Sequence, residues 1–360
     1  MSAELPLLIQ VLRRNKQLTS LSATDWDLLI RQAKRSQIVA KLYYLAANQS
    51  LLDQLPVAVF RHLQTAKVTA DKQTRDFLWE VEKLKAVFAN LEQPLLFLKG
   101  AAYAVANLPA HQGRLFSDMD LLVPFSAIDS VEKQLLIHGW ISSKQTAYDQ
   151  RYYRQWMHEI PPLTHVKRGS VVDLHHNILP RTAVACPNPL LLLEAAEKVP
   201  GVEGVKILGA LDRVIHSATH LFYDGELEHG LRDLLDLDCL LTALNADSKR
   251  QLVKRAIELG LQQPVYYALR YLQRLLDTPD LDEALQLLTK AGCEHHLILV
   301  LDALFMRALM PDHRSCNDAW TGFARWLLYI RSHYLRMPLK LLIPHLSRKA
   351  WLRLVDKDTD

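Results

Sequence analysis

The spacing of hydrophobic residues changes twice along this chain of 360 residues. Up to about residue 90 apolar side chains recur at helical intervals, as Leu78, Val81 and Leu84 do. This spacing predicts three helices, within residues 6–12, 22–51 and 57–90. From about 91 to 180 the apolar runs become short and Pro and Gly become frequent, which indicates strands mixed with helices. Beyond Gly204 the helical pattern returns to the end of the chain.

We therefore expect an α+β protein, helical for most of its length, with a small mixed β-sheet. The pattern divides it into an N-terminal helical region (1–90), an α/β core (91–180) and a C-terminal helical domain (181–360). The N-terminal region would be a scaffold packed on the core, or a module that recognises a partner. Within the core, the aromatic stretch 145–156 could form a strand at the rim of a cleft, where an aromatic ring could stack a base.

Composition narrows the class of protein only modestly. Hydrophobic residues make up 49% of the chain, enough for a large core, and the net charge of +4 is too small to argue for nucleic acid. The four cysteines are far apart and form no Cys-x-x-Cys pair, so neither a zinc ribbon nor a redox motif is indicated. The N-terminus does not resemble a signal peptide, and no apolar run reaches the ~18 residues of a membrane span. We expect a cytoplasmic protein without a transmembrane segment.

The strongest chemical signal is a pair of aspartates, Asp118 and Asp120, at the start of the apolar run 119–123. Alternate residues of a strand share one face, so both carboxylates would project from the same side. Two adjacent carboxylates repel each other unless a cation lies between them. Their hard oxygen ligands suit Mg²⁺ or Mn²⁺. The pair therefore predicts a metal site that handles phosphate.

Two further segments fit such a site. Asp173 lies in another short apolar run, Val171–Leu174, and a strand there could lie beside 119–123 and aim this acid at the same metals. Upstream, the apolar run 94–98 leads directly into Lys99, Gly100 and a helical stretch that begins at Ala101. Free N–H groups at a helix start can hold phosphate oxygens. Gly100 would let the backbone approach a ligand closely, and Lys99 would add positive charge.

These segments, together with Arg114, Ser117 and the run Val172-Asp-Leu-His175, resemble the uncharacterised bacterial nucleotidyltransferases of the polymerase-β-like superfamily. The resemblance implies a metal triad of Asp118, Asp120 and Asp173, with Asp173 as a possible general base. It also implies a nucleotide site that includes Lys99–Ala101, Arg114 and Ser117. The expected substrate is a nucleoside triphosphate, ATP in particular, with Mg²⁺ or Mn²⁺. Downstream segments 216–237 and 332–338 also resemble this family.

Three histidines are candidates for the acceptor side of such a site. Alternation places His175 on the same sheet face as Asp173. His216 and His220 stand four residues apart on one helix face. They could line the acceptor cleft, be ordinary hydrogen-bonded histidines, or hold zinc, although the sequence indicates no third ligand.

The expected activity is transfer of a nucleoside monophosphate to a hydroxyl group, with release of pyrophosphate. A small-molecule acceptor, such as an amino sugar or another cell-surface precursor, is favoured. A toxin-like enzyme that modifies tRNA or a protein is the alternative, and a non-catalytic nucleotide-binding scaffold is a third possibility. All three acids are present, which argues against loss of activity.

The segment 319–355 combines seven Lys/Arg with no acidic residue and carries interleaved aromatics. Such a basic, aromatic tail could contact an acidic partner, RNA or a membrane surface. The simpler interpretation is a helix that buries its aromatic side chains and exposes its charges.

Overall fold

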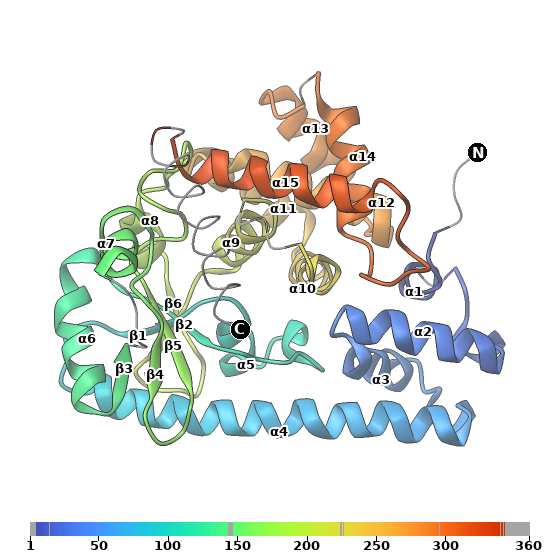
Figure 1. Ribbon diagram of the computed structural model, residues 1–360, viewed down its shortest axis with the longest axis horizontal. Helices are drawn as coiled ribbons and strands as arrows, with labels where there is room; N and C mark the ends of the chain where they lie inside the picture. The colour runs from blue at the N-terminus through green and yellow to red at the C-terminus, as the bar shows by residue number, and fades with distance from the viewer. Residues whose placement is uncertain are drawn as a thin grey trace, which may run out of the picture.

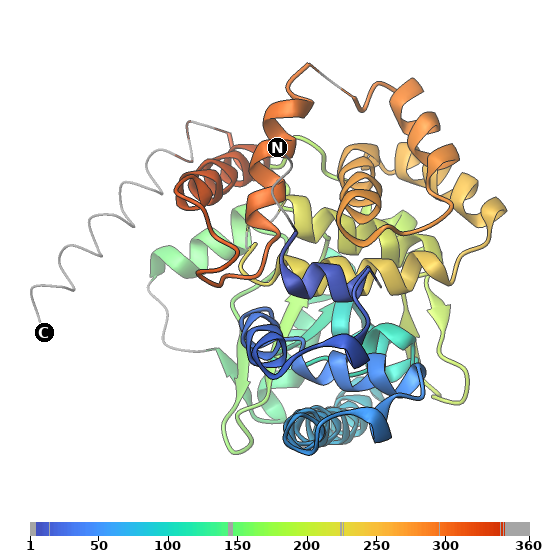
Figure 2. The same cartoon turned by 90° about the vertical axis from the view of Figure 1, so that its right-hand side faces the viewer.

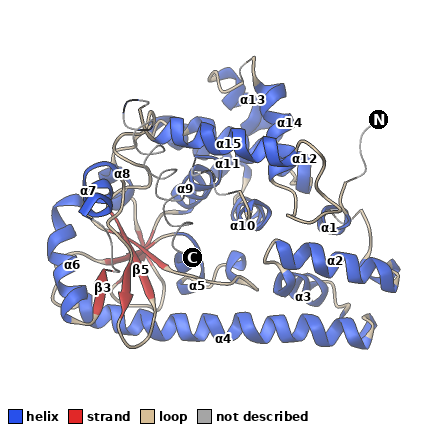
Figure 3. Cartoon of the chain, viewed as in Figure 1, coloured by secondary structure: helices blue, strands red, loops and turns tan. Residues whose placement is uncertain are grey.

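A mixed β-sheet lies at one end of the molecule, and helices make up most of the rest (Figure 1, Figure 3). The computed structural model describes residues 5–13, 15–142, 147–223, 225, 227–294, 296–338, 340 and 342. Its strands form one seven-stranded sheet in the order β3-β4-β5-β2-β1-β7-β6. The predicted α+β class, with helix predominating, is confirmed.

The N-terminal region is helical, as its periodicity predicts, but the span 22–51, expected to be one helix, forms two, with Gln37 at a φ of 57° between them. Its helices are α1 (Leu7–Leu12), α2 (Ala23–Arg35), α3 (Val39–Asn48) and α4 (Val57–Phe88). Ser22 caps α2 by accepting from the Asp25 backbone N–H at 3.1 Å, and the Asp25 carboxylate accepts from the Ser22 N–H at 3.0 Å. The long helix α4 runs under both the sheet and the helices α2 and α3 (Figure 1). Figure 2, which views α4 end-on, shows the N-terminal helices between α4 and the C-terminal helices.

The core alternates short strands with helices. Its elements are β1 (Leu95–Phe97), α5 (Lys99–Val105), β2 (Met119–Leu122), α6 (Ile128–Ile137), β3 (Trp140–Ser142), α7 (Ala147–Trp156), β4 (Leu163–His165), β5 (Val171–His175), α8 (Pro189–Glu194), β6 (Glu197–Lys198) and β7 (Val205–Ile207). β2 pairs with β5 in parallel and with β1 antiparallel, so it lies in the middle of the sheet. Its four residues are all buried.

Two strands extend the sheet beyond the expected core. β7 pairs in parallel with β1, opposing Val205 to Leu95, and β6 then pairs antiparallel with β7. The expectation that the chain is helical throughout after Gly204 is therefore wrong at β7. The run Val205–Ile207 is only three residues long, so its pattern does not distinguish a strand from the start of a helix.

A second correction concerns the aromatic stretch 145–156. Residues 143–146 lie outside the described part of the chain, and Ala147–Trp156 form helix α7 rather than a strand. Tyr152 and Trp156, four residues apart, bring their ring centroids to 5.9 Å. Residues four apart are neighbours on one face of a helix, so this contact is expected there.

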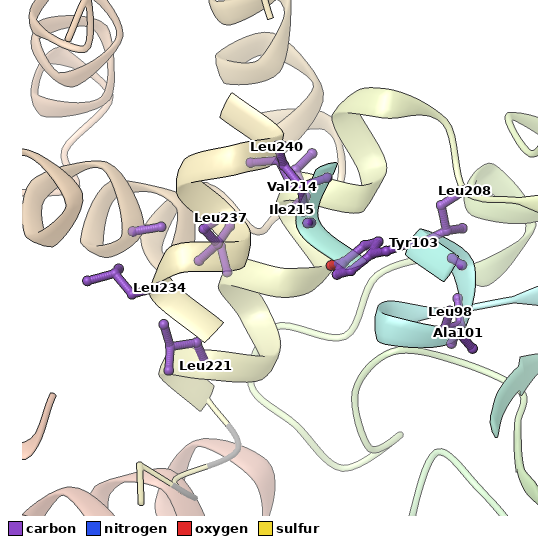
Figure 4. Packing of buried hydrophobic residues seen from close by; sticks show 14 of the residues in the cluster. Leu98, Ala101, Tyr103, Leu208, Val214, Ile215, Leu221, Leu234, Leu237 and Leu240 are labelled. Carbon is purple, nitrogen blue, oxygen red and sulfur yellow. The ribbon is translucent and has the colours of Figure 1, made fainter. Parts of the chain in front are cut away.

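The C-terminal helices cover the other side of the core. They are α9 (Ala210–Tyr223), α10 (Gly230–Thr242), α11 (Ala246–Glu258), α12 (Gln262–Leu276), α13 (Asp282–Lys290), α14 (Ile298–Ala308) and α15 (Thr321–Arg336). Leu98 and the α5 residues Ala101 and Tyr103 belong to the same buried cluster as side chains of α9 and α10 (Figure 4). Apolar burial thus fixes α9 and α10 against the junction of β1 and α5. No helix in the described ranges has the length and apolar character needed to cross a bilayer.

The aromatic side chains at the start of the basic tail are exposed, whereas the simpler interpretation expects them to be buried. Trp320, Phe323 and Trp326 are 63%, 49% and 56% exposed, whereas Ala324 and Leu328 of the same helix are buried. Helix α15 therefore docks through its smaller side chains and presents aromatic rings to the surface. Trp351 lies outside the described residues.

Candidate functional site

The two acidic segments of the sequence meet on neighbouring strands. β2 and β5 run in parallel, with Asp120 directly opposite Asp173 and Met119 opposite Val172. Since alternate residues share a face, Asp118, Asp120, Asp173 and His175 project from the same side of the sheet. The prediction that the two strands are neighbours is confirmed.

Asp120 is the most constrained of these acids. Its side chain is 7% exposed, and its Oδ1 accepts hydrogen bonds from Lys99 Nζ at 3.0 Å and from His175 Nε2 at 2.9 Å. Burial alone would raise the pKa of Asp120, but Lys99 and His175 outweigh it and hold that pKa well below its usual range. Asp120 is therefore a carboxylate at neutral pH.

Asp173 has the opposite electrostatic environment. Burial, and then the negative charge of Asp120, raises the pKa of Asp173 to about 7, and Glu159 and Asp118 add to this shift. Its Oδ1 is buried and has no hydrogen-bond partner among the described residues. An unpartnered carboxylate oxygen beside further carboxylates is a donor set that fits a divalent cation of the Mg²⁺ class. The oxygens of the three aspartates do not all lie within 4.8 Å of one another in the described part of the chain, as mutual repulsion predicts.

Asp118 and Ser117 form the open side of this region. Asp118 is half-buried and accepts a hydrogen bond from the Ser117 hydroxyl at 3.0 Å. Both residues line a cavity of about 510 Å³ between α4 and the starts of β2 and β5, with Trp79 and Phe116 also in its wall. The cavity is the size of a small-molecule site.

The β1–α5 junction is built differently from the expectation. Helix α5 begins at Lys99, whose φ of 45° is unusual for a residue other than glycine and indicates local strain. Gly100 is buried, and a Cβ atom there would lie 2.5 Å from Arg114 Nε. The close approach that requires glycine is thus made by Arg114. Lys99 pairs with Asp120, and Ala101 is buried in the first turn of α5.

Arg114 connects the core to the helical domain. Its side chain is 12% exposed, and its Nη1 lies 2.5 Å from Asp236 Oδ2 and 3.6 Å from Asp233 Oδ1, both on α10. Lys41 of α3 reaches the other oxygen of Asp236 at 3.0 Å. Burial by itself would lower the pKa of Arg114, but Asp236 and Asp233 raise it, so the guanidinium stays charged. Direct contact of Arg114 with a phosphate stays a prediction.

The structure brings two of the three candidate histidines to the acids. His175 contacts Asp120 directly, as described above. His216 of α9 is buried; burial lowers its pKa well below the usual range, and the positive charge of Lys99 lowers it further. His220, four residues after His216, lies one turn farther along the same side of α9. Its charge influences both His216 and Asp233. Whether these side chains contact an acceptor stays a prediction.

Sequence reasoning missed residues that complete the neighbourhood of Asp120. Glu159 Oε2 lies 3.4 Å from His175 Nδ1, and the rings of His158 and His175 are 5.2 Å apart between centroids. The adjacent pair His158-Glu159, just before Ile160 and two prolines, was the available signal. Nothing in its spacing to His175 distinguishes it from an ordinary polar turn.

Comparison with known proteins gives one result that bears on this geometry. No curated protein matches the chain. The family model described as uncharacterised nucleotidyltransferase matches residues 22–277. That range contains the whole sheet, the three aspartates and helices α9 to α11, and it spans well over half of the chain. The chain therefore belongs to this family of uncharacterised nucleotidyltransferases.

Proposed function

We propose that the protein is a divalent-metal-dependent enzyme that transfers a nucleoside monophosphate from a nucleoside triphosphate to a hydroxyl group. The observation that carries the proposal is the in-register pair Asp120 and Asp173 on adjacent parallel strands. Alternation places Asp118, two residues before Asp120, on the same face. The buried, unpartnered Oδ1 of Asp173 supports it. When bound, cations such as Mg²⁺ or Mn²⁺ would neutralise these carboxylates and the triphosphate.

The chain's own residues divide the work of this reaction. The acceptor oxygen forms a bond to the α-phosphorus, the bond from that phosphorus to the bridging oxygen breaks, and pyrophosphate leaves with the electron pair. Asp173, with a pKa raised to about 7, can accept the hydroxyl proton near neutral pH. Asp120 stays ionised, and Asp118 and Asp120 would serve as oxygen ligands. Positioning supplies most of the rate enhancement.

The triphosphate would lie at the β1–α5 junction. The first backbone N–H groups of a helix point out of its end, and at the start of α5 those of Gly100 and Ala101 suit phosphate oxygens. The Lys99 ammonium, now paired with Asp120, could exchange that carboxylate for a phosphate once cations take its place. Ser117 and Arg114 would border the nucleotide. We expect ATP as the nucleotide.

A small-molecule acceptor is the better-supported choice. The cavity of about 510 Å³ beside Asp118 can enclose a sugar-sized compound, and Trp79 and Phe116 offer rings for stacking. His216 and His220 would border the acceptor from α9, where burial favours the neutral form of His216.

The experiment that identifies the reaction is mass spectrometry of a metabolite extract incubated with the protein, Mg²⁺ and each nucleoside triphosphate in turn. We expect one new compound heavier than its precursor by one nucleoside monophosphate. Asp118→Ala should abolish it, whereas Asp129→Asn, on an exposed residue in the first turn of α6, should not. A product that forms equally with Asp118→Ala would overturn the assignment. Nucleotide binding without turnover for any extract would favour a scaffold role.

A further inference from the structure

A second set of metal-type donors lies on the far side of His175 from Asp120. In the described part of the chain, His158, Glu159 and His175 are a group whose ligand atoms all lie within 4.8 Å of one another. Two imidazole nitrogens and one carboxylate oxygen differ from the all-oxygen set of the three aspartates. The two groups of donors therefore favour different classes of cation.

The backbone fixes the three donors relative to one another. Glu159 forms an isolated antiparallel bridge with His175. On either side, the His176 N–H donates to the His158 carbonyl at 2.8 Å and the Ile160 N–H donates to the Leu174 carbonyl at 3.0 Å. The segment is thus an extra stretch of sheet on β5, and the donors do not depend on a mobile loop.

One ring nitrogen of each histidine lacks a hydrogen-bond partner. The Nδ1 atoms of His158 and His175 are buried and have no hydrogen-bond partner among the described residues. Because His175 Nε2 already contacts Asp120 Oδ1 at 2.9 Å, Nδ1 is the His175 nitrogen left to face Glu159 and a cation. Buried nitrogens of this kind are costly unless an ion or a water molecule satisfies them.

The distance between two of the donors fits a tetrahedral cation. His175 Nδ1 and Glu159 Oε2 are 3.4 Å apart. Two ligands bound at about 2.0–2.1 Å in tetrahedral arrangement stand about 3.4 Å apart. A direct hydrogen bond from His175 Nδ1 to Glu159 is the competing explanation, but the contact at 3.4 Å does not have hydrogen-bond geometry.

We propose that His158, Glu159 and His175 form a binding site for a divalent transition-metal cation of the zinc class, separate from the aspartate site. Two histidines and one glutamate leave a tetrahedral ion one open position. Asp120, which accepts from the other nitrogen of His175, takes the place of the carboxylate that commonly orients a metal-bound histidine. The site would thereby hold Asp120 in position beside Asp173, so the two metal sites share one carboxylate as their link.

The test uses Co²⁺ and Zn²⁺ on the full chain after treatment with a chelator. We expect one equivalent of Co²⁺ to give the visible absorption of a low-coordinate site, and Zn²⁺ to displace it. His158→Ala and the isosteric Glu159→Gln should each weaken binding at least tenfold. Asp120→Asn should weaken it about 10–100-fold, as loss of an orienting partner does.

His176→Ala is the matched control. His176 is the next residue along the chain, but its ring contacts Phe125 at 4.9 Å between centroids and it is not among the three donors. It should bind Co²⁺ as the wild type does. Circular dichroism verifies the fold of each variant, and Zn²⁺ should raise the melting temperature of the wild type but not that of Glu159→Gln. The proposal is overturned if the wild type takes up no Co²⁺, or if His158→Ala and Glu159→Gln bind it with wild-type affinity.

Discussion

At the scale of single residues, two aspartates that face each other across neighbouring strands differ in protonation. Lys99 and His175 keep Asp120 ionised, whereas the buried Oδ1 of Asp173 has no hydrogen-bond partner among the described residues. Asp120 is therefore suited to be a permanent anion, and the adjacent Asp173 is suited to accept a proton. Such separation of pKa values within one site is typical of acid–base chemistry.

Asp173 should make stability depend on pH. Between its ordinary value of 3.8 and about 7, the folded protein retains a proton that the unfolded chain releases, so the free energy of unfolding falls as pH rises. Asp173→Asn removes this penalty. Relative to the wild type, the variant should gain up to about 3 kcal/mol between about pH 5 and pH 8. Thermal melts in chelator at both pH values measure this, and a difference that stays constant with pH would contradict the assignment.

Gly100 should be irreplaceable for a packing reason. In Gly100→Ala the new Cβ would lie 2.5 Å from Arg114 Nε, and Arg114 cannot retreat without losing Asp236. We expect a loss of about 1–3 kcal/mol in the free energy of unfolding. Gly322→Ala, in α15 with open space around it, should be neutral or slightly stabilising. Urea unfolding compares the two variants. Equal changes in the free energy of unfolding would show that the Arg114 side chain moves aside at little cost.

The sequence predicts which residues share a face where the alternation of side chains along a strand determines it. Asp118, Asp120, Asp173 and His175 were placed on one face because strand side chains alternate. The His158–Glu159 pair was not found, because its closeness to His175 depends on a bridge between segments that only the folded chain brings together.

At the scale of elements, α10 is tied to the core by charge as well as by apolar packing. Asp236 is 2% exposed, and its two carboxylate oxygens form ion pairs with Arg114 of the core and Lys41 of α3. The sequence suggested only that Asp236 belongs to a polar helix face. Helical periodicity identifies a face but not the partners of that face, which come from segments far away in the chain.

Asp236→Asn tests this tie. Removal of the charge would leave the largely buried Lys41 without its carboxylate and the largely buried Arg114 with only the more distant Asp233, and we expect a loss of about 3–5 kcal/mol. Asp247→Asn, which breaks an exposed pair with Arg250, should cost at most about 1 kcal/mol. Urea denaturation of both variants gives the comparison. A small effect for Asp236→Asn would mean that water reaches this carboxylate.

Element prediction failed where runs were short or two periods overlapped. Strand β7 has only three residues, too few to show a periodicity. The aromatic residues of α7 suggest a strand by composition, although Tyr152 and Trp156 have helical spacing. The long helix α4 was predicted nearly to its ends, because its 32 residues repeat the pattern many times.

At the scale of the whole molecule, aromatic rings of α15 form an exposed surface. Trp320, Phe323 and Trp326 contact one another, with centroids 6.3 and 5.9 Å apart along the series. Composition predicted a helix with these aromatics buried, because aromatic residues are usually counted toward the core. The buried side of α15 consists instead of Thr321, Ala324, Leu328 and Ser332 among others.

This orientation of α15 has a direct test. Trp326→Ser should change the free energy of unfolding by no more than about 0.5 kcal/mol, as surface substitutions do. Leu328→Ala, on the buried side of the same helix, should cost about 2–5 kcal/mol. Chemical denaturation measures both. The reverse order of effects would show that the helix is rotated.

The central claim is that Asp118, Asp120 and Asp173 act together in nucleotidyl transfer. The most direct measurement is the rate of pyrophosphate release from a labelled nucleoside triphosphate, with Mg²⁺ and the identified acceptor, for the wild type and each Asp→Asn variant. We predict that each of the three variants loses at least about a hundredfold in rate, that chelator abolishes the wild-type rate, and that Asp129→Asn retains it. Wild-type rates in correctly folded Asp118→Asn, Asp120→Asn or Asp173→Asn would contradict the account.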